Sequence, residues 1–536
     1  MQKSSSPKPA RRVLIVGGGA AGWLTACYLA RHLGGDRADG LDITLLESPD
    51  IGIIGVGEGT FPTIRNILRT LGIDEGTFMR ESHATFKQGI RFDDWEVAPQ
   101  VNASGDLEHS HYLHPFEAPY WGREELQLVP YWLLQDKATR KPFAEAVTFQ
   151  KRVADSSLGP KRLHQGNYQG PLNYAYHFDA NLFAALLAKH AKTLGVRHLS
   201  GLMSGVILAA DGSIDHVTSP DHGDLDADLF IDCTGFRSEL LGKALNVPFK
   251  RIDDILFTDR AITVQVPYAT PDAPLPSYTI STAHEAGWTW DIGLPERRGV
   301  GYVYSSQHST DERAAEVLRA YTGLSEDAMT RSLRFEAGYR TAHWVKNCVG
   351  VGLSAGFLEP LESTGMVLIE SAVNKIVEYF PFTGPLDASA DLFNDQMITR
   401  YNTIIGFIKL HYCLSKRQEP FWRDNTQPDS IPEHLQKRLA LWKTRPPSRF
   451  DFILDYESFA HFSYQYILYG MGFETDFEAA RGAYTDTELA KQIFGRVVDF
   501  GGRASADLVS HRSLIKAIYK GGFTEQPPVG AKMVAR

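Results

Sequence analysis

The segment RRVLIVGGGAAGW at residues 11–23 decides the fold of this 536-residue chain. It begins with a short apolar run that fits a buried parallel strand, and an apolar helix is predicted at 24–33, after the glycine turn. Gly17 permits the tight turn, Gly19 lets the backbone approach a pyrophosphate, and Gly22 lets the helix pack closely on the strand. The N-terminus of the helix offers unpaired N–H groups to phosphates.

A second strand is predicted at 42–46, and it ends at Glu47, whose carboxylate can accept hydrogen bonds from a ribose. Strand, glycine turn, helix and terminal acid together predict a dinucleotide site. A turn with a purely structural role is the alternative. The residues expected to bind the cofactor in this unit are Gly17, Gly19, Ala20, Ala21, Gly22 and Glu47.

The composition is that of a soluble globular enzyme, with 43% hydrophobic and 22% charged residues. A formal net charge of −9 argues against nucleic acid as the main partner. The four cysteines show no C-x-x-C spacing, so neither a disulfide framework nor a zinc site is expected. His109, His111 and His114 lie close together but lack a helical i,i+4 pair with a carboxylate, so no metal is predicted.

The N-terminal residues and the hydropathy of the chain indicate where in the cell the protein is expected. Residues 1–10 are basic and lack an apolar core, which predicts a disordered leader rather than a signal peptide. No run of about 18 apolar residues occurs, so we expect a cytoplasmic protein without membrane contact.

Two segments after the first unit, a glycine-rich stretch and an alternating apolar–polar stretch, are candidates for the site. The glycine-rich stretch from residue 51 is interpreted as a strap beside a cofactor ring, with a flexible loop as the alternative, and its expected contacts are Gly55, Val56, Gly57 and Glu58. Residues 84–95, ATFKQGIRFDDW, alternate between apolar and polar positions, which predicts a half-buried strand with Lys87 on its polar face.

Later segments extend this pattern. A strand at 226–232 runs into a small-residue turn at 233–235 that should return beside the first glycine turn, and strands at 261–266 and 287–306 predict a second sheet. A helix is predicted at 366–380, and its N-terminus suits a flavin carbonyl or a small anion. The remainder, 395–536, reads as mainly helical.

Seven motifs occur in order: GGGAAGW at 17–23, GVGEGTFP at 55–62, TFKQGIRFDDW at 85–95, HPF at 114–116, DCTGF at 232–236, GWTWDIG at 287–293 and LEPLESTG at 358–365. On these motifs the chain resembles the flavin-dependent halogenases of the tryptophan halogenase family, over roughly residues 11 to 475.

The resemblance implies an α/β fold: a Rossmann-like FAD-binding domain of the two-dinucleotide-binding flavoprotein type, a β-sheet substrate lobe and a mainly helical C-terminal region. We therefore predict a discontinuous FAD-binding domain (11–95, 175–250 and 340–385), a substrate-binding lobe (96–174, 251–339 and 386–520) and a tail (521–536).

The resemblance also implies an activity. In the family, reduced FAD, oxygen and halide give hypohalous acid, which crosses the protein to an electron-rich aromatic substrate. Lys87 matches the catalytic lysine, which hydrogen-bonds the hypohalous acid or carries the halogen as a haloamine. Glu362 matches the acid that orients the oxidant or takes the proton lost from the ring. Chloride or bromide is expected near the backbone of Thr364 and Gly365.

Further residues follow from the same match. Leu353, Gly365 and Met366 are expected to contact FAD, and His114, Pro115, Phe116, Ser363 and Phe459 to contact substrate. Trp288, Trp290 and Ile292 should form a wall that keeps substrate away from the flavin. Gly293 stands where the family pattern has proline, which puts the local backbone of the wall in doubt.

The substrate is expected to lack an amino-acid group. Glu117 stands where members specific for free tryptophan tend to have glycine, and Leu454 aligns loosely with a glutamate that binds the amino-acid end. Because leucine cannot pair with an ammonium group, we expect free tryptophan to be a poor substrate, and indole or another electron-rich arene to be better.

Two competing functions remain at this point: an FAD-dependent aromatic monooxygenase and a non-catalytic FAD-binding redox protein. Trp288, Trp290 and Lys87 favour the halogenase, because a hydroxylase must let its substrate reach the flavin and needs no relay amine. No second nucleotide-binding unit for NADPH is evident, so a separate flavin reductase is the expected partner. A homodimer is left open.

Overall fold

The computed structural model of the protein describes residues 10–37, 39–49, 57–122, 126–382, 386–453 and 456–523. Gly55 and Val56 of the expected strap, and Leu454 of the expected substrate segment, lie outside these ranges.

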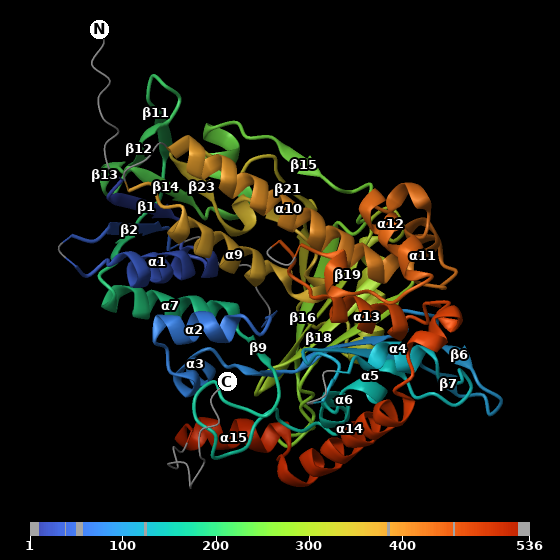
Figure 1. The fold of residues 1–536 in the computed structure, drawn as a ribbon. Helices are drawn as coiled ribbons and strands as arrows, with labels where there is room; N and C mark the ends of the chain where they lie inside the picture. The colour runs from blue at the N-terminus through green and yellow to red at the C-terminus, as the bar shows by residue number, and fades with distance from the viewer. Residues whose placement is uncertain are drawn as a thin grey trace.

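The strand that carries the glycine turn lies inside a six-stranded sheet (Figure 1). β1 (Arg12–Val16) pairs in parallel with β2 (Asp42–Glu47) on one side and with β14 (Leu229–Asp232) on the other. Because β14 leads directly into Cys233, its loop reaches the glycine turn, as predicted. The other strands of this sheet are β10 (Arg197–Ser200), β23 (Cys348–Gly350) and β22 (Trp344–Val345).

Three helices pack together beside this sheet (Figure 1): α1 (Ala20–Leu33) contacts both α7 (Ala180–Thr193) and α9 (Thr364–Glu378). The predicted α/β fold class is confirmed by this arrangement. α1 begins at Ala20 and not at residue 24, because Gly19 is its extended N-cap. A sheet of β11 (Gly205–Leu208), β12 (Ile214–Ser219) and β13 (Gly223–Asp226) packs on the six-stranded sheet through a separate apolar cluster.

The three glycines of the turn differ in their surroundings. Gly17 has φ +116°, and a Cβ atom there would lie 2.1 Å from the carbonyl oxygen of Cys233. A Cβ at Gly22 would lie 1.9 Å from the carbonyl oxygen of Gly17. A Cβ at Gly19 would meet nothing within 4 Å. Two glycines therefore serve close packing, and the third faces open space at the start of α1.

The second large sheet has seven strands, in the order β20-β16-β19-β18-β17-β5-β8. Its β18 continues to Gly293, which pairs with Arg298 in the antiparallel register, so the missing proline leaves the strand regular. The bounds are β5 (Gly89–Asp93), β8 (His111–Pro115), β16 (Arg260–Pro267), β17 (Thr279–His284), β18 (Gly287–Gly293), β19 (Arg297–Tyr304) and β20 (Arg331–Arg334).

The strand predicted at 84–95 is in fact two strands in different sheets. β4 (Thr85–Lys87) joins a small sheet with β9 (Ala175–Phe178) and β3 (Glu58–Gly59), whereas β5 belongs to the seven-stranded sheet. The break falls at Gln88, whose backbone N–H and side chain both bond to Ser277. The expectation that Lys87 projects from a polar face is therefore wrong, because the side chain is fully buried.

Helices fill most of the C-terminal third, as predicted (Figure 1). The long α10 (Leu386–Cys413) contacts α9 and α11, and α14 and α15 lie at the far edge of the molecule. The remaining bounds are α2 (Ile64–Leu71), α3 (Glu75–Glu81), α4 (Leu128–Leu133), α5 (Phe143–Val147), α6 (Gln150–Asp155), α8 (Asp311–Thr322), α11 (Pro420–Asn425), α12 (Glu433–Trp442), α13 (His461–Gly470), α14 (Thr487–Asp507) and α15 (His511–Gly521).

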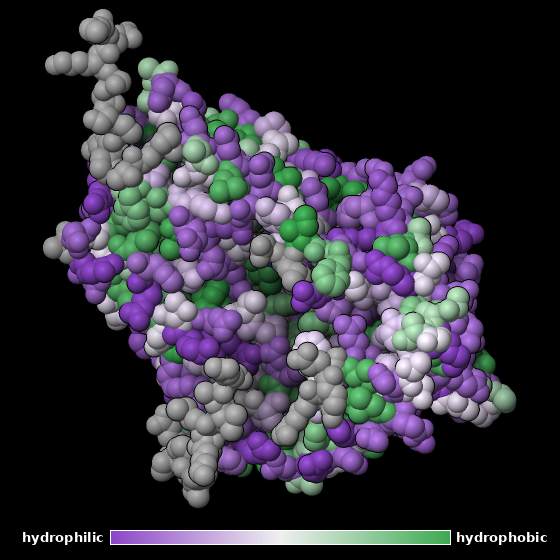
Figure 2. Space-filling model, viewed as in Figure 1, coloured by the Kyte–Doolittle hydropathy of each residue, from purple (hydrophilic) through white to green (hydrophobic). Residues whose placement is uncertain are grey.

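The surface in Figure 2 is mostly polar, with apolar side chains in small separate groups and a hollow near its centre. Among the helices that the structure describes, none combines the length and apolar character that a bilayer crossing requires. The division into two discontinuous domains stays a prediction. β5, which it assigns to the FAD-binding part, pairs in the seven-stranded sheet.

The contrast between Gly17 and Gly19 can be tested by thermal and urea unfolding. We expect Gly17→Ala to lower the free energy of unfolding by about 1–3 kcal/mol, because the new side chain combines an unfavourable φ with a backbone clash. Gly19→Ser is the control, since it adds a side chain into open space at a helix N-cap and should be nearly neutral. Equal losses in the two variants would contradict this account.

Candidate active site

Lys87 is the centre of the site. Its side chain has no exposed surface, and its Nζ donates a hydrogen bond to Ser363 Oγ at 2.8 Å. Nζ also lies 5.5 Å from the centre of the Phe116 ring. Burial lowers the pKa of Lys87 to about 7, and the charge of Glu362 opposes this shift only in part. Near neutral pH the buried group is therefore divided between ammonium and free amine.

Glu362 is a fully buried carboxylate held by two histidines. His114 Nδ1 lies 2.9 Å from Oε1 and 3.2 Å from Oε2, and His411 Nε2 lies 2.9 Å from Oε1. Burial alone would raise the pKa of Glu362, but attraction to His114 and the bonds from both histidines outweigh it and lower the pKa to about 2. The carboxylate is thus an ionised acceptor.

Aromatic rings from distant segments meet beside these groups. Phe61 contacts Phe116 with ring centres 5.6 Å apart and Phe459 at 5.1 Å. Phe459 stacks on Phe407 at 3.7 Å, and His114 lies 6.5 Å from Phe459. The predicted His114, Phe116 and Phe459 are therefore brought together, and Pro115 lies between the first two on β8 and its extension.

Sequence reasoning missed three members of this cluster: Phe61, Phe407 and His411. Phe61 stands in the quoted GVGEGTFP motif but was given no role, so the motif itself was a usable signal. Phe407 and His411 lie one helical turn apart on α10, where nothing local distinguishes them from core residues.

The turn before α9 combines strain with an unsatisfied hydroxyl. Ser363 has φ +57°, which directs its Oγ toward Lys87 while Thr364 opens the helix. Thr364 Oγ1 is buried and has no hydrogen-bond partner among the described residues. A Cβ at Gly365 would meet nothing within 4 Å, and Met366 follows as a buried residue. This turn offers an unused donor and open backbone.

The three wall residues lie on one strand, β18, and all are buried. The rings of Trp288 and Trp290 are 6.3 Å apart at an interplanar angle of 58°. Ile292 approaches the position of a Cβ on Gly57 to 3.8 Å, so one end of the wall adjoins the predicted strap. At the other end Trp288 packs on Trp95 at 6.3 Å.

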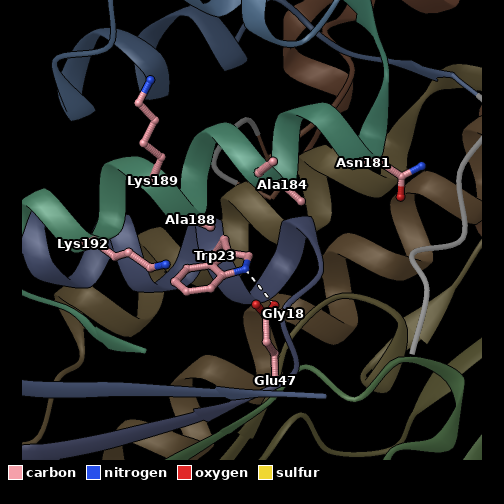
Figure 3. Close-up of a pocket in the computed structure, with 9 residues that line it drawn as sticks. Gly18, Trp23, Glu47, Asn181, Ala184, Ala188, Lys189 and Lys192 are labelled. Atoms are coloured by element: carbon pink, nitrogen blue, oxygen red, sulfur yellow. Dashed lines mark hydrogen bonds between the residues drawn. The ribbon is translucent and has the colours of Figure 1, made fainter. Parts of the chain in front are cut away.

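Glu47 already has protein partners at the end of β2. Trp23 Nε1 donates to its Oε2 at 3.1 Å, and His198 Nε2 lies 2.9 Å from its Oε1. Glu47 and Gly18 line one side of a cavity of about 500 Å³ between α1 and α7 (Figure 3). A Cβ at Gly18 would collide with Glu47, so only glycine fits beneath the carboxylate.

The cofactor candidates of the first unit and of the 352–354 turn lie together. A Cβ on Gly352 would come within 2.9 Å of Ala21 Cβ, which places the 352–354 turn, with Leu353, beside the first turn of α1, which begins at Ala20. Glu58 opens β3, which pairs with β9. The open backbone at Gly19, the N-terminus of α1 and the carboxylate of Glu47 fit the phosphates and ribose of a dinucleotide.

The strain at Ser363 gives a matched pair of variants. Ser363→Ala and Ser363→Gly both remove the bond from Lys87, but only glycine tolerates φ +57° without cost. We expect the free energy of unfolding of Ser363→Gly to exceed that of Ser363→Ala by about 1 kcal/mol in urea denaturation. An equal or reversed order would show that the turn is not strained.

Comparison with known proteins agrees with this geometry. A family model described as tryptophan halogenase matches residues 12–484. The 7-chloro-L-tryptophan 6-halogenase KtzR of Kutzneria sp. (strain 744) is 35% identical, with 93% of this chain and 98% of KtzR covered.

Two solved structures are also similar. The tryptophan halogenase of Shewanella frigidimarina NCIMB 400 has a TM-score of 0.91 and 40% identity, covering 97% of this chain and 99% of its own. Tar14, a tryptophan C-6 flavin-dependent halogenase (chlorinase) from taromycin biosynthesis, has a TM-score of 0.86 and 36% identity, covering 95% and 99%. The resemblance predicted from the motifs is confirmed: the chain belongs to the tryptophan halogenase family.

Proposed function

We propose that the protein is an FADH2-dependent halogenase that makes hypohalous acid from oxygen and chloride or bromide and transfers the halogen to an aromatic substrate through Lys87. The observation that carries this proposal is the fully buried Lys87 amine, bonded to Ser363 and facing the Phe116 ring. Burying the Lys87 amine costs free energy, and its described contacts do not explain that cost as a gain in stability. A buried amine does suit the transfer of an oxidant. Membership of the family supports the same function.

The chain's own residues divide the work. When bound, reduced FAD supplies the electrons with which oxygen and halide give hypohalous acid. Trp288 and Trp290 keep the arene away from that step. Lys87, with a pKa of about 7, can donate a hydrogen bond to the oxidant as ammonium or accept the halogen as free amine. Glu362 then takes the proton that the substituted ring loses.

Cofactor and halide are assigned to separate parts of the site. The glycine turn, Glu47 and the 352–354 turn would hold FAD, and Gly365 and Met366 would approach its ring. Thr364 and Gly365 suit the halide, because the N-terminus of α9 carries partial positive charge and Thr364 Oγ1 has no described partner. Reduced FAD is proposed to come from a separate flavin reductase.

The monooxygenase alternative is weaker on two counts. A hydroxylase brings the substrate ring to the flavin, yet the Trp288–Trp290 pair fills the strand that adjoins the strap residue Gly57. A hydroxylase also has no step that requires the Lys87 amine. A non-catalytic redox protein has no step that requires either the buried Lys87 amine or the ionised Glu362 carboxylate.

Lys87→Ala tests the relay. We expect halogenated product to fall by at least about 100-fold, as when a catalytic group is removed, while reduced FAD and oxygen are still consumed. Product is followed by mass spectrometry with a reductase, NADH, FAD and each halide, and oxygen by electrode. Lys437→Ala, at an exposed lysine of α12, is the control for the loss of a lysine. Unchanged halogenation in Lys87→Ala would refute the relay.

The proposed substrate is indole or a similar arene without a zwitterion. Leu454 provides no charge for an ammonium group, and the described carboxylates on either side of it are already paired. Asp451 is bonded to Arg445, and Glu457 lies 3.0 Å from Arg438.

Steady-state kinetics with indole and with free tryptophan test this specificity. We expect kcat/KM for indole to exceed that for tryptophan by about tenfold or more, because an unpaired ammonium group buried in the pocket costs at least about 1.4 kcal/mol. Leu454→Glu should narrow the difference by favouring tryptophan, and Leu454→Gln is its uncharged control. Much faster conversion of free tryptophan by the wild type would overturn the substrate assignment.

A further inference from the structure

His411 lies behind Glu362, on the long helix α10, and is fully buried. Its two ring nitrogens face different acceptors. Nδ1 lies 2.9 Å from the carbonyl oxygen of Phe407, and Nε2 lies 2.9 Å from Glu362 Oε1. A carbonyl oxygen can only accept a hydrogen bond, and so can an ionised carboxylate. Both bonds form only if both ring nitrogens carry a proton, which makes the ring an imidazolium.

The two carboxylate oxygens of Glu362 differ in the hydrogen bonds that they accept. Oε1 accepts from His114 and His411, both at 2.9 Å, which engages both of its lone pairs. Among the described residues, Oε2 has only the longer contact with His114, at 3.2 Å. Oε2 is therefore the atom that keeps capacity to accept a further proton.

Few other charges reach this pair. Lys87 on β4 and Tyr112 on β8 interact electrostatically with Glu362, and His114 on β8 donates to it. Around His411 the contacts are aromatic, from Phe92, Trp95 and Phe407. The second acid of the same turn, Glu359, accepts a bond from Tyr412, so it does not compete for His411.

We propose that His411 is a positioning residue for halogenation: as an imidazolium it holds Glu362 ionised and turned so that Oε2 accepts the ring proton. The inference rests on the proposed function. When the carbon–halogen bond has formed, the ring C–H bond breaks, its electron pair restores the aromatic ring, and the proton goes to Oε2. His411 keeps both of its protons throughout. Its charge lets a carboxylate stay ionised in a dry aromatic setting.

The test is the pH profile of kcat for halogenation of indole. His411→Gln keeps an N–H donor for Glu362 but removes the charge, so the acidic limb should move up by about 1–3 pH units. Tyr412→Phe is the matched control: it removes a buried hydrogen bond from the neighbouring residue, directed at Glu359, and should leave the limb in place.

The outcomes separate the two hypotheses. A wild type that yields no halogenated product defeats the proposed function itself. A wild type that halogenates, with an unshifted profile in His411→Gln, overturns only the role of His411.

A second measurement needs no folded variant. In wild-type protein labelled with ¹⁵N-histidine, one ring should carry slowly exchanging protons on both nitrogens, as the two acceptors around His411 require. The absence of any such ring would overturn the inference.

Discussion

Burying the amine of Lys87 is the constraint on which the rest of the site depends. Removing an ammonium group from water costs free energy, which three groups offset in part. They are the hydroxyl of Ser363, the ring of Phe116 and the carboxylate of Glu362. These partners do not restore the ordinary pKa, so the group remains able to lose its proton near neutral pH. A surface lysine would be permanently charged and solvated, and could not accept a halogen at this pH.

The elements around Lys87 leave its side chain no exposed surface, and they come from several parts of the fold. β4 carries Lys87 in a small three-stranded sheet that is distinct from the two large sheets. The predicted wall residues on β18 belong to the seven-stranded sheet, and the glycine turn follows β1 of the six-stranded one. From the C-terminal half, the turn before α9 supplies Ser363 to the amine and Glu362 beside it, and α10 supplies His411 to Glu362. All of these groups are remote from β4 in the sequence.

Much of the fold around the candidate site could be predicted from local sequence. The glycine turn, the strands beside it and the helix predicted at 366–380 follow from residue spacing, and the structure confirms them, with α9 beginning two residues earlier, at Thr364. The break at Gln88 could not be predicted, because it depends on bonds to Ser277 and Leu158, which are remote in the sequence. The roles of Phe407 and His411 were hidden for the same reason, since their partners lie on other elements.

The most direct measurement is the titration of Lys87 in the intact protein. Lysine labelled with ¹³C at Cε gives one NMR signal per side chain, and the signal missing from Lys87→Met belongs to residue 87. This account predicts that this signal titrates with a pKa of about 7, well below the ordinary 10.5 of lysine. A pKa near 10.5 would contradict the account, because it would mean that the amine is solvated or fully paired.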